Sequence, residues 1–292
     1  MPNPVDKTLE PQPSGRAAEF AAAHAAEHPL KLYGGWFCPF VQRAWITLHE
    51  KRIAHQYIEI NPYHKEASFL ALNPRGLVPT LAVPVAGPGA NGNAPHRREQ
   101  KPLYESTVLC EYLDEAYADE GHYGPRLLPA EDAYERARCR LWIDHIGTKI
   151  VPGFYQVIQH TPDKAYSLEE ARRKLLSSIA TWVQEMDGDE PSGPWFLGDR
   201  FSLVDVMLAP WARRLFLIDH YKPGGVGIAE ARREDEKTWA RWQRWFDAMM
   251  ARDSLRNTTS TDDKYIEVYK RYAEDTTGSE VGQATRDGKR LP

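Results

Sequence analysis

A cysteine stands where the sequence predicts the start of a helix. Cys38 follows residues 34–37 (GGWF) and precedes Pro39, and proline is favoured in the first turn of a helix. The unpaired backbone N–H groups of a helix start and the helix dipole both stabilise a thiolate there. We therefore expect the pKa of Cys38 to lie below the ordinary value of about 8.5. The alternative is a buried cysteine that packs as a small apolar side chain.

The motif around this cysteine, CPFV, lacks the second cysteine of a Cys-x-x-Cys pair. Exchange at Cys38 would therefore pass through a mixed disulfide with an external thiol, which a second thiol must resolve. Cys110 and Cys139 lie inside helical patterns, and we expect both to be packing residues. Three scattered cysteines without metal-ligand spacing suit a reducing compartment, so we expect a cytoplasmic protein without a metal.

Length and composition favour two packed domains. The chain has 292 residues, of which 42% are hydrophobic and 27% charged, as in ordinary globular proteins. Its formal net charge of −4 gives no reason to expect nucleic acid or an anionic membrane as a partner. No run of about 18 apolar residues is present, and the N-terminus lacks an apolar signal region, so we expect no membrane association.

The N-terminal half alternates strand and helix patterns after a leader, residues 1–29, that we expect to be flexible. Strands are predicted at 30–33, at 55–60, after the turn NPRGLVPTL and at 101–104, and helices after Cys38, at 65–72 and from Glu105. The order β-α-β-α-β-β-α predicts an α/β thioredoxin-like domain over residues 30–118. A polar segment at 87–101 predicts a surface insertion between the last two strands.

Beyond residue 127 only helical patterns remain, at 134–150, 168–186, 203–218 and 238–250. Ser167 with Glu170, and Ser202 with Asp205, have the spacing of helix capping boxes, each contributing ~1 kcal/mol. We therefore expect an all-α domain over residues 127–273, followed by a polar, disordered tail at 274–292.

Four segments in succession resemble the omega-class glutathione transferases: WFCPFVQRAW, NPRGLVPTL, LYESTVLCEYLDEAY and LLPAEDAYERAR. The likeness extends over residues 30–272, and related cysteine-type classes share the Cys-Pro-Phe opening. The resemblance implies the glutathione transferase fold, glutathione as co-substrate, a small electrophilic or disulfide second substrate, and a homodimer.

The resemblance also implies roles for individual residues. Cys38 matches the catalytic cysteine, and Lys65 matches the lysine that meets the glycyl carboxylate of glutathione. Val78 should precede a cis bond to Pro79 and offer its backbone to the tripeptide. Glu105 and Ser106 match the pair that holds the γ-glutamyl end. Taken singly, each could be an ordinary turn, cap or surface residue; taken together, in this order, they predict a glutathione site.

The pocket for the second substrate is predicted by the same resemblance. Phe40 belongs to the glutathione site and borders this pocket, and Trp211, Arg214 and Tyr265 match positions that face it. Core packing explains Trp211 equally well.

Cys38 and the resemblance together predict a glutathione-dependent thiol transferase with reductase activity toward dehydroascorbate, glutathionyl adducts or glutathionylated thiols. Two alternatives stay open. One is a transferase that conjugates glutathione, or an isomerase, on the same fold. The other is a glutathione-binding regulatory protein without turnover, which the insertion and the two terminal extensions would favour.

Overall fold

The computed structural model describes residues 11–85, 99–186 and 193–291. It divides into two compact units, each described by itself. The N-terminal unit comprises Glu10–Pro125 and the short segment Asn257–Ser260, and the helical unit comprises Arg126–Arg256 and the residues from Thr261 onward. The first change from one unit to the other within the described chain falls between Pro125 and Arg126.

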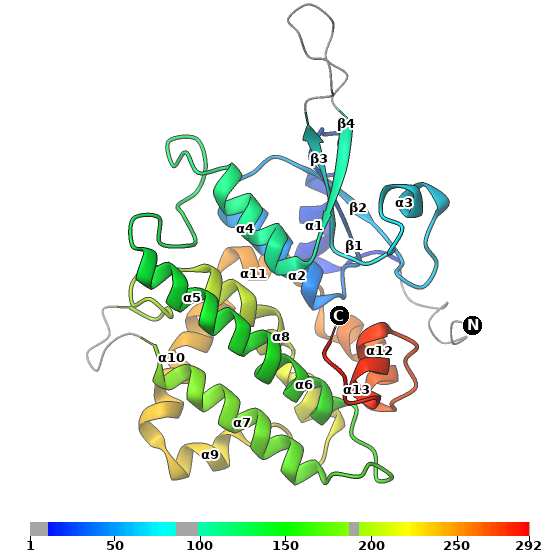
Figure 1. Cartoon of the computed structure of the whole chain (residues 1–292). Coiled ribbons are helices and arrows are strands. Elements are labelled where there is room, and N and C mark those ends of the chain that lie inside the picture. The colour runs from blue at the N-terminus through cyan, green and yellow to red at the C-terminus, as the bar shows by residue number, and fades with distance from the viewer. Residues whose placement is uncertain (1–10, 86–98, 187–192, 292) are drawn as a thin grey trace, which may run out of the picture. The chain divides into compact units, whose positions relative to one another are not determined.

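A four-stranded sheet forms the centre of the N-terminal unit. Its strands lie in the order β2-β1-β3-β4 (Figure 1). β1 and β2 pair in parallel, whereas β3 pairs antiparallel with both β1 and β4. The strands are β1 (Lys31–Gly34), β2 (Gln56–Glu59), β3 (Thr80–Val85) and β4 (Glu99–Tyr104). Together with the helices between them, they confirm the predicted thioredoxin-like order.

Helices lie on both faces of this sheet (Figure 1). Neighbouring side chains of a strand point to opposite faces of the sheet. In the pairing of β1 with β2, Tyr57 of β2 lies opposite the neighbour of Tyr33, so Tyr57 and Tyr33 point to opposite faces. Tyr57 stacks on Trp45 of α2, with ring centroids 4.3 Å apart, and Tyr33 meets Phe69 of α3 at 5.6 Å. The helices of this unit are α1 (Gly15–Ala23), α2 (Pro39–Glu50), α3 (Ala67–Leu72) and α4 (Ser106–Ala116).

Two features of this unit differ from the sequence prediction. The predicted flexible leader contains α1, because Ala17 is fully buried and the Phe20 ring lies 5.7 Å from that of Trp45. The predicted insertion ends earlier than residue 101, since β4 begins at Glu99, which pairs with Val85. The part of that insertion at residues 87–98 lies outside the described residues.

The helical unit confirms the all-α prediction. Its helices are α5 (Ala133–His145), the π-helix η2 (Ile146–Ile150), α6 (Val151–Ile158), α7 (Leu168–Gln184), α8 (Leu203–Tyr221), α9 (Ile228–Glu234), α10 (Glu236–Ala251), α11 (Asp253–Asn257), α12 (Asp262–Ala273) and α13 (Glu280–Arg286). Both predicted capping boxes are present, at Ser167 and at Ser202. The single helix predicted at 134–150 is instead α5 continued through η2 into α6. α13 lies in the segment predicted as a disordered tail.

A buried carboxylate joins three parts of the helical unit. Asp205, in the first turn of α8, accepts hydrogen bonds from the Ser202 backbone N–H at 2.8 Å, the Phe196 backbone N–H at 2.9 Å and the Trp245 indole at 2.8 Å. These bonds fix the start of α8 against α10 and the preceding loop. The unit's core therefore rests on a satisfied buried polar group as well as on apolar packing.

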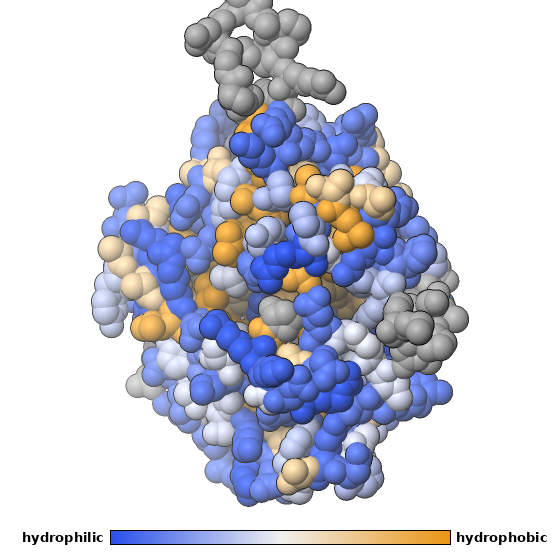
Figure 2. All heavy atoms as spheres, turned by 45° about the vertical axis from the view of Figure 1, so that its right-hand side comes forward, coloured by the Kyte–Doolittle hydropathy of each residue, from blue (hydrophilic) through white to orange (hydrophobic). Residues whose placement is uncertain are grey.

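No described helix combines the length and the apolar character that crossing a bilayer requires. On the face shown in Figure 2, polar residues predominate and apolar ones occur in scattered groups.

Candidate active site

The sheet brings several of the predicted glutathione-site residues to one end. In the register, Tyr33 pairs with Thr80, and Thr80 pairs with Tyr104. The turn after β1, the turn before β3 and the turn after β4 therefore leave the sheet at the same end. They carry Cys38, Val78 with Pro79, and Glu105 with Ser106, respectively. β2 ends here as well, because Glu59 pairs with Gly34.

Cys38 occupies the N-cap position of α2, with Pro39 as the first helical residue, as the sequence predicts. Its backbone N–H donates to the Gly35 carbonyl at 2.9 Å, and its own carbonyl accepts from the Gln42 N–H at 3.1 Å. Gly34 is required beneath this turn, since a Cβ there would lie 2.3 Å from a methyl of Val41. The cysteine thus stands on a tightly packed turn, next to the N–H groups of a helix start.

The three cysteines differ in accessibility. None forms a disulfide, and Cys38 is partly exposed whereas Cys110 and Cys139 are completely buried. Burial raises the pKa of the Cys110 thiol to about 12 and that of the Cys139 thiol to about 12. Because the thiolate is the reactive form, these two thiols are suppressed as nucleophiles. Cys38 is the accessible candidate.

Glu105 and Ser106 form the start of α4. Glu105 is the N-cap residue and adopts φ +71°, a conformation that is strained for a residue other than glycine. Its carboxylate pairs with Arg75 at 3.1 Å, and the Ser106 hydroxyl accepts a hydrogen bond from Arg43 at 3.2 Å. A hydroxyl that already accepts one bond can still donate its own proton to a ligand carboxylate. The helix N-terminus favours an anion at the same place.

The Lys65 side chain lies against the turn that precedes β3. The Val78–Pro79 bond is cis, as the resemblance implies. Two residues earlier, Gly76 has φ +64°, and a Cβ built there would lie 3.0 Å from Nζ of Lys65. The ammonium group therefore lies against the turn that leads to Val78. Phe40, in the first turn of α2, lies with its ring centroid 5.5 Å from the Arg43 guanidinium carbon.

Sequence reasoning missed three residues at this end of the sheet: Arg43, Arg75 and Glu59. Arg43 is almost fully buried, with 4% of its surface exposed, and reaches Ser106 across 63 residues of sequence. Arg75 pairs with Glu105 across 30 residues. No local pattern predicts contacts between distant segments. The one available signal was an arginine, Arg43, on a largely apolar helix face, which could have indicated a buried polar contact.

The residues predicted for the second substrate lie in the helical unit and are buried. Trp211, Arg214 and Tyr265 are each at most 1% exposed. Arg214 lies over the Tyr265 ring at 4.5 Å and donates to the Pro210 carbonyl at 2.7 Å. The structure thus brings Arg214 and Tyr265 together. The burial of Trp211 is what the core-packing alternative for that residue expects.

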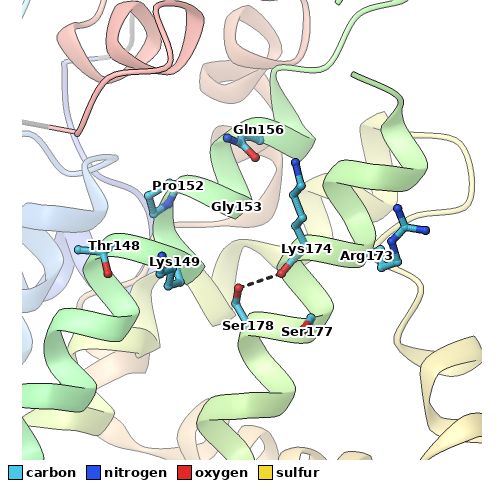
Figure 3. A pocket seen from close by; sticks show the side chains of 9 residues that line it. All are labelled: Thr148, Lys149, Pro152, Gly153, Gln156, Arg173, Lys174, Ser177 and Ser178. Carbon is cyan, nitrogen blue, oxygen red and sulfur yellow. Dashed lines mark hydrogen bonds between the residues drawn. The ribbon is translucent and has the colours of Figure 1, made fainter. Parts of the chain in front are cut away.

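A separate pocket of about 520 Å³ lies in the helical unit (Figure 3). Residues of η2, α6 and α7 line it, and the Lys174 side chain extends from α7 toward Gln156 of α6. It contains none of the predicted site residues, so it is not the candidate active site.

Two family descriptions match this chain. The N-terminal domain of glutathione S-transferases matches residues 37–116, and the C-terminal domain matches residues 165–248. The first match contains Cys38 and the turns at the sheet end. The second contains the capping box at Ser202 and Asp205.

Individual relatives agree with these matches. Pig glutathione S-transferase omega-1 is 33% identical over 187 residues, which cover 64% of this chain and 67% of the relative. The crystal structure of glutathione transferase Omega 3C from Trametes versicolor superposes with a TM-score of 0.71 at 35% identity, covering 89% of this chain and 97% of that one. A rice transferase solved in complex with glutathione shares the fold at 24% identity, with a TM-score of 0.63 and coverage of 86% and 98%. This chain therefore belongs to the glutathione S-transferase family and, within it, to the omega class.

Proposed function

We propose that this transferase is a glutathione-dependent thiol transferase with reductase activity, working through a mixed disulfide at Cys38. The observation that carries the proposal is the contrast among the three thiols. Cys38 is partly exposed at a helix N-terminus, whereas burial raises the pKa of Cys110 and Cys139 to about 12. A serine or tyrosine hydroxyl would activate the thiol of glutathione by hydrogen bonding. A cysteine thiolate at that place instead exchanges with an existing glutathione disulfide, so that Cys38 takes up the glutathionyl group and the other sulfur leaves as a thiolate.

The proposed reaction has two exchange steps. The Cys38 thiolate attacks the glutathione sulfur of a glutathionylated thiol, so that the new disulfide forms at Cys38 and the substrate leaves as a thiolate. The thiolate of a second glutathione then attacks that glutathione sulfur, releases the Cys38 thiolate and forms oxidised glutathione. Each step breaks one disulfide and makes one. Dehydroascorbate is a further proposed acceptor, its two-electron reduction being balanced by oxidation of two glutathione molecules.

The residues at the sheet end suit the chemistry of glutathione. Ser106 and the N-terminus of α4 suit the γ-glutamyl carboxylate, and the Glu105 carboxylate suits the ammonium group. The backbone of Val78 suits the cysteinyl peptide, and Lys65 and Phe40 would border the rest of the tripeptide. Holding glutathione in this way would bring its sulfur to Cys38 and make the exchange effectively intramolecular. We propose that Trp211, Arg214 and Tyr265 influence acceptor choice through packing.

We also propose that the protein works as a homodimer in the reducing cytoplasm, where Cys38 would remain a thiol. Apolar side chains that a second copy could cover support the dimer: Val108 of α4 is 52% exposed, and Tyr134 and Leu141 of α5 are 76% and 69% exposed. Analytical ultracentrifugation of the wild type and Leu141→Glu tests this part. A monomeric wild type at micromolar concentration would contradict it.

The activity test compares the wild type with Cys38→Ser and Cys110→Ala. The assay follows oxidised glutathione formed from reduced glutathione and a mixed disulfide of glutathione with a small thiol. We expect Cys38→Ser to lose at least 100-fold in rate and Cys110→Ala to retain most of it. If Cys38→Ser conjugated glutathione to an electrophile as well as or better than the wild type, the conjugating or isomerase alternative would hold. If the wild type bound glutathione but turned over no thiol substrate, the regulatory alternative would hold.

A further inference from the structure

A partly buried carboxylate supports the turn that carries Cys38. Glu59 is the last residue of β2 and pairs with Gly34, the last residue of β1. One of its oxygens, Oε1, accepts the backbone N–H of Trp36 at 2.9 Å, and the other, Oε2, accepts the Tyr57 hydroxyl at 2.8 Å. Trp36 lies two residues before Cys38, so Glu59 connects the end of the sheet directly to the cysteine's turn.

The Trp36 bond is well placed to control the position of Cys38. Residues 35–38 form a turn that is closed by the Cys38 N–H donating to the Gly35 carbonyl at 2.9 Å. Trp36 is the first of the two central residues of this turn, and its side chain is 1% exposed and meets Phe37 edge-on at 5.6 Å. The turn ends at the N-cap of α2, so a shift of the Trp36 backbone would be passed to Cys38.

The other partner of Glu59 is itself held firmly. Tyr57 is buried and its ring stacks on Trp45 of α2, with an interplanar angle of 6°. The carboxylate thus lies between a fixed hydroxyl and the amide of the turn. Among the described residues, no charged side chain pairs with Glu59, and Tyr57 is the titratable group in contact with it. The turn at residues 35–38 itself carries one titratable side chain, that of Cys38.

We propose that Glu59 is a positioning residue for Cys38: through the Trp36 amide its carboxylate holds the turn at residues 35–38, so that thiol–disulfide exchange at Cys38 depends on the charge of Glu59. The idea rests on the proposed function, in which Cys38 exchanges with glutathione. The physical basis is that an ionised acceptor makes a shorter and roughly twice as strong a hydrogen bond as a neutral one. Proton uptake by Glu59 therefore weakens the support of the turn.

This proton uptake falls in an accessible pH range. Burial raises the pKa of Glu59 to about 8, although the hydrogen bonds from Tyr57 and Trp36 pull it downward. Above about pH 8 the ionised Glu59 holds the turn, and as the pH falls the protonated form releases it. Exchange at Cys38 should therefore follow two ionisations, one of the Cys38 thiol and one of Glu59.

The test measures Cys38 alkylation by iodoacetamide and its glutathionylation by oxidised glutathione, from pH 6 to pH 10, with the modified peptide identified by mass. At pH 9 we expect Glu59→Gln to react roughly three- to tenfold more slowly than the wild type, the range that a difference of about 1 kcal/mol in one hydrogen bond gives. The pH profile of Cys38 modification in Glu59→Gln should contain one ionisation, whereas the wild-type profile should contain two. Tyr57→Phe removes a bond that lowers the pKa of Glu59, so its second ionisation should move to higher pH.

Glu27→Gln is the matched control, because Glu27 is an exposed carboxylate of the same unit that pairs with Lys31 at 3.4 Å. It should reproduce the wild-type profile. If Glu59→Gln keeps the wild-type rate and both ionisations, or loses stability without any change in the profile, Glu59 has no positioning role and the proposal is overturned. Alkylation needs no glutathione, so a wild type that fails to react with oxidised glutathione contradicts the proposed function while the alkylation profile still decides the role of Glu59.

Discussion

Replacing Asp205 with Asn should destabilise the helical unit by several kcal/mol. The carboxylate is fully buried, and its oxygen Oδ1 accepts the Phe196 N–H and the Trp245 indole N–H, while Oδ2 accepts the backbone N–H and the hydroxyl of Ser202. An asparagine can keep its carbonyl at the first position, but its NH₂ group then faces the Ser202 N–H. The Ser202 hydroxyl can rotate to accept from the amide, whereas the backbone N–H loses its partner.

The magnitude follows from these contacts. One buried N–H without a partner costs about 1–3 kcal/mol, and changing the two remaining bonds from charged to neutral acceptors costs roughly 1 kcal/mol each. We therefore expect about 3–5 kcal/mol for Asp205→Asn, which is a large share of a typical stability of about 5–15 kcal/mol. Asp205→Ala leaves three buried N–H groups without partners, and by the same rule it should cost roughly 3–9 kcal/mol.

Urea unfolding, followed by tryptophan fluorescence and by circular dichroism, provides the assay. Trp245→Phe supplies the matched control because it removes one of the four donors. In that background Asp205→Ala should cost about 1–3 kcal/mol less than in the wild type, since one fewer N–H is left without a partner. A cost below 1 kcal/mol for Asp205→Asn, or no coupling between the two positions, would refute this account of how α8 begins.

Three further predictions concern other contacts. Lys51→Met removes one partner of a fully buried ion pair, in which the ammonium group lies 3.3 Å from the Asp114 carboxylate. Thermal and urea unfolding should show a loss of about 3–5 kcal/mol, which Lys51→Met combined with Asp114→Leu largely restores. Gly34→Ala should slow Cys38 alkylation and lower the free energy of unfolding by about 1–3 kcal/mol, because the new Cβ would lie 2.3 Å from Val41. Adding Val41→Ala should recover part of the alkylation rate. Equal rates in the wild type, Gly34→Ala and the double variant would contradict this. Burial would raise the pKa of Asp275, but hydrogen bonds from two basic side chains and an amide outweigh burial and lower the pKa. The ionised Asp275 therefore stabilises the protein above about pH 4, and this stabilisation disappears as the pH falls further. Asp275→Asn should therefore be less stable than the wild type at pH 7 and similar to it near pH 2, as measured by unfolding across that range.

The features of the fold that depend on residues close together in the sequence could be predicted from local sequence patterns. The placement of Cys38 at a helix start followed from Pro39, and the two capping boxes followed from Ser and an acidic residue three positions later. The strand and helix order of the N-terminal unit followed from hydrophobic periodicity. In each case the residues that cause the structure lie within a few positions of it.

Contacts between distant segments could not be predicted in this way. α1 has an alanine-rich, polar sequence, and its order depends on Phe20 packing against Trp45 of α2. The helix predicted at 134–150 does not end there: it changes to π-helical geometry at Ile146–Ile150 and continues as α6. A 3.6-residue pattern does not describe π-helical geometry. Arg43 and Glu59 acquire their roles at the candidate site only once β1, β2 and α4 meet at the end of the sheet.

The central claim is that Cys38 is the thiol that exchanges with glutathione. Intact mass after incubation with oxidised glutathione tests it most directly, on the wild type, Cys38→Ser and Cys110→Ala. We expect the wild type and Cys110→Ala to gain one glutathione, which excess reduced glutathione removes, and Cys38→Ser to gain none. An adduct that persists in Cys38→Ser, or a wild type that forms no adduct, would contradict the account.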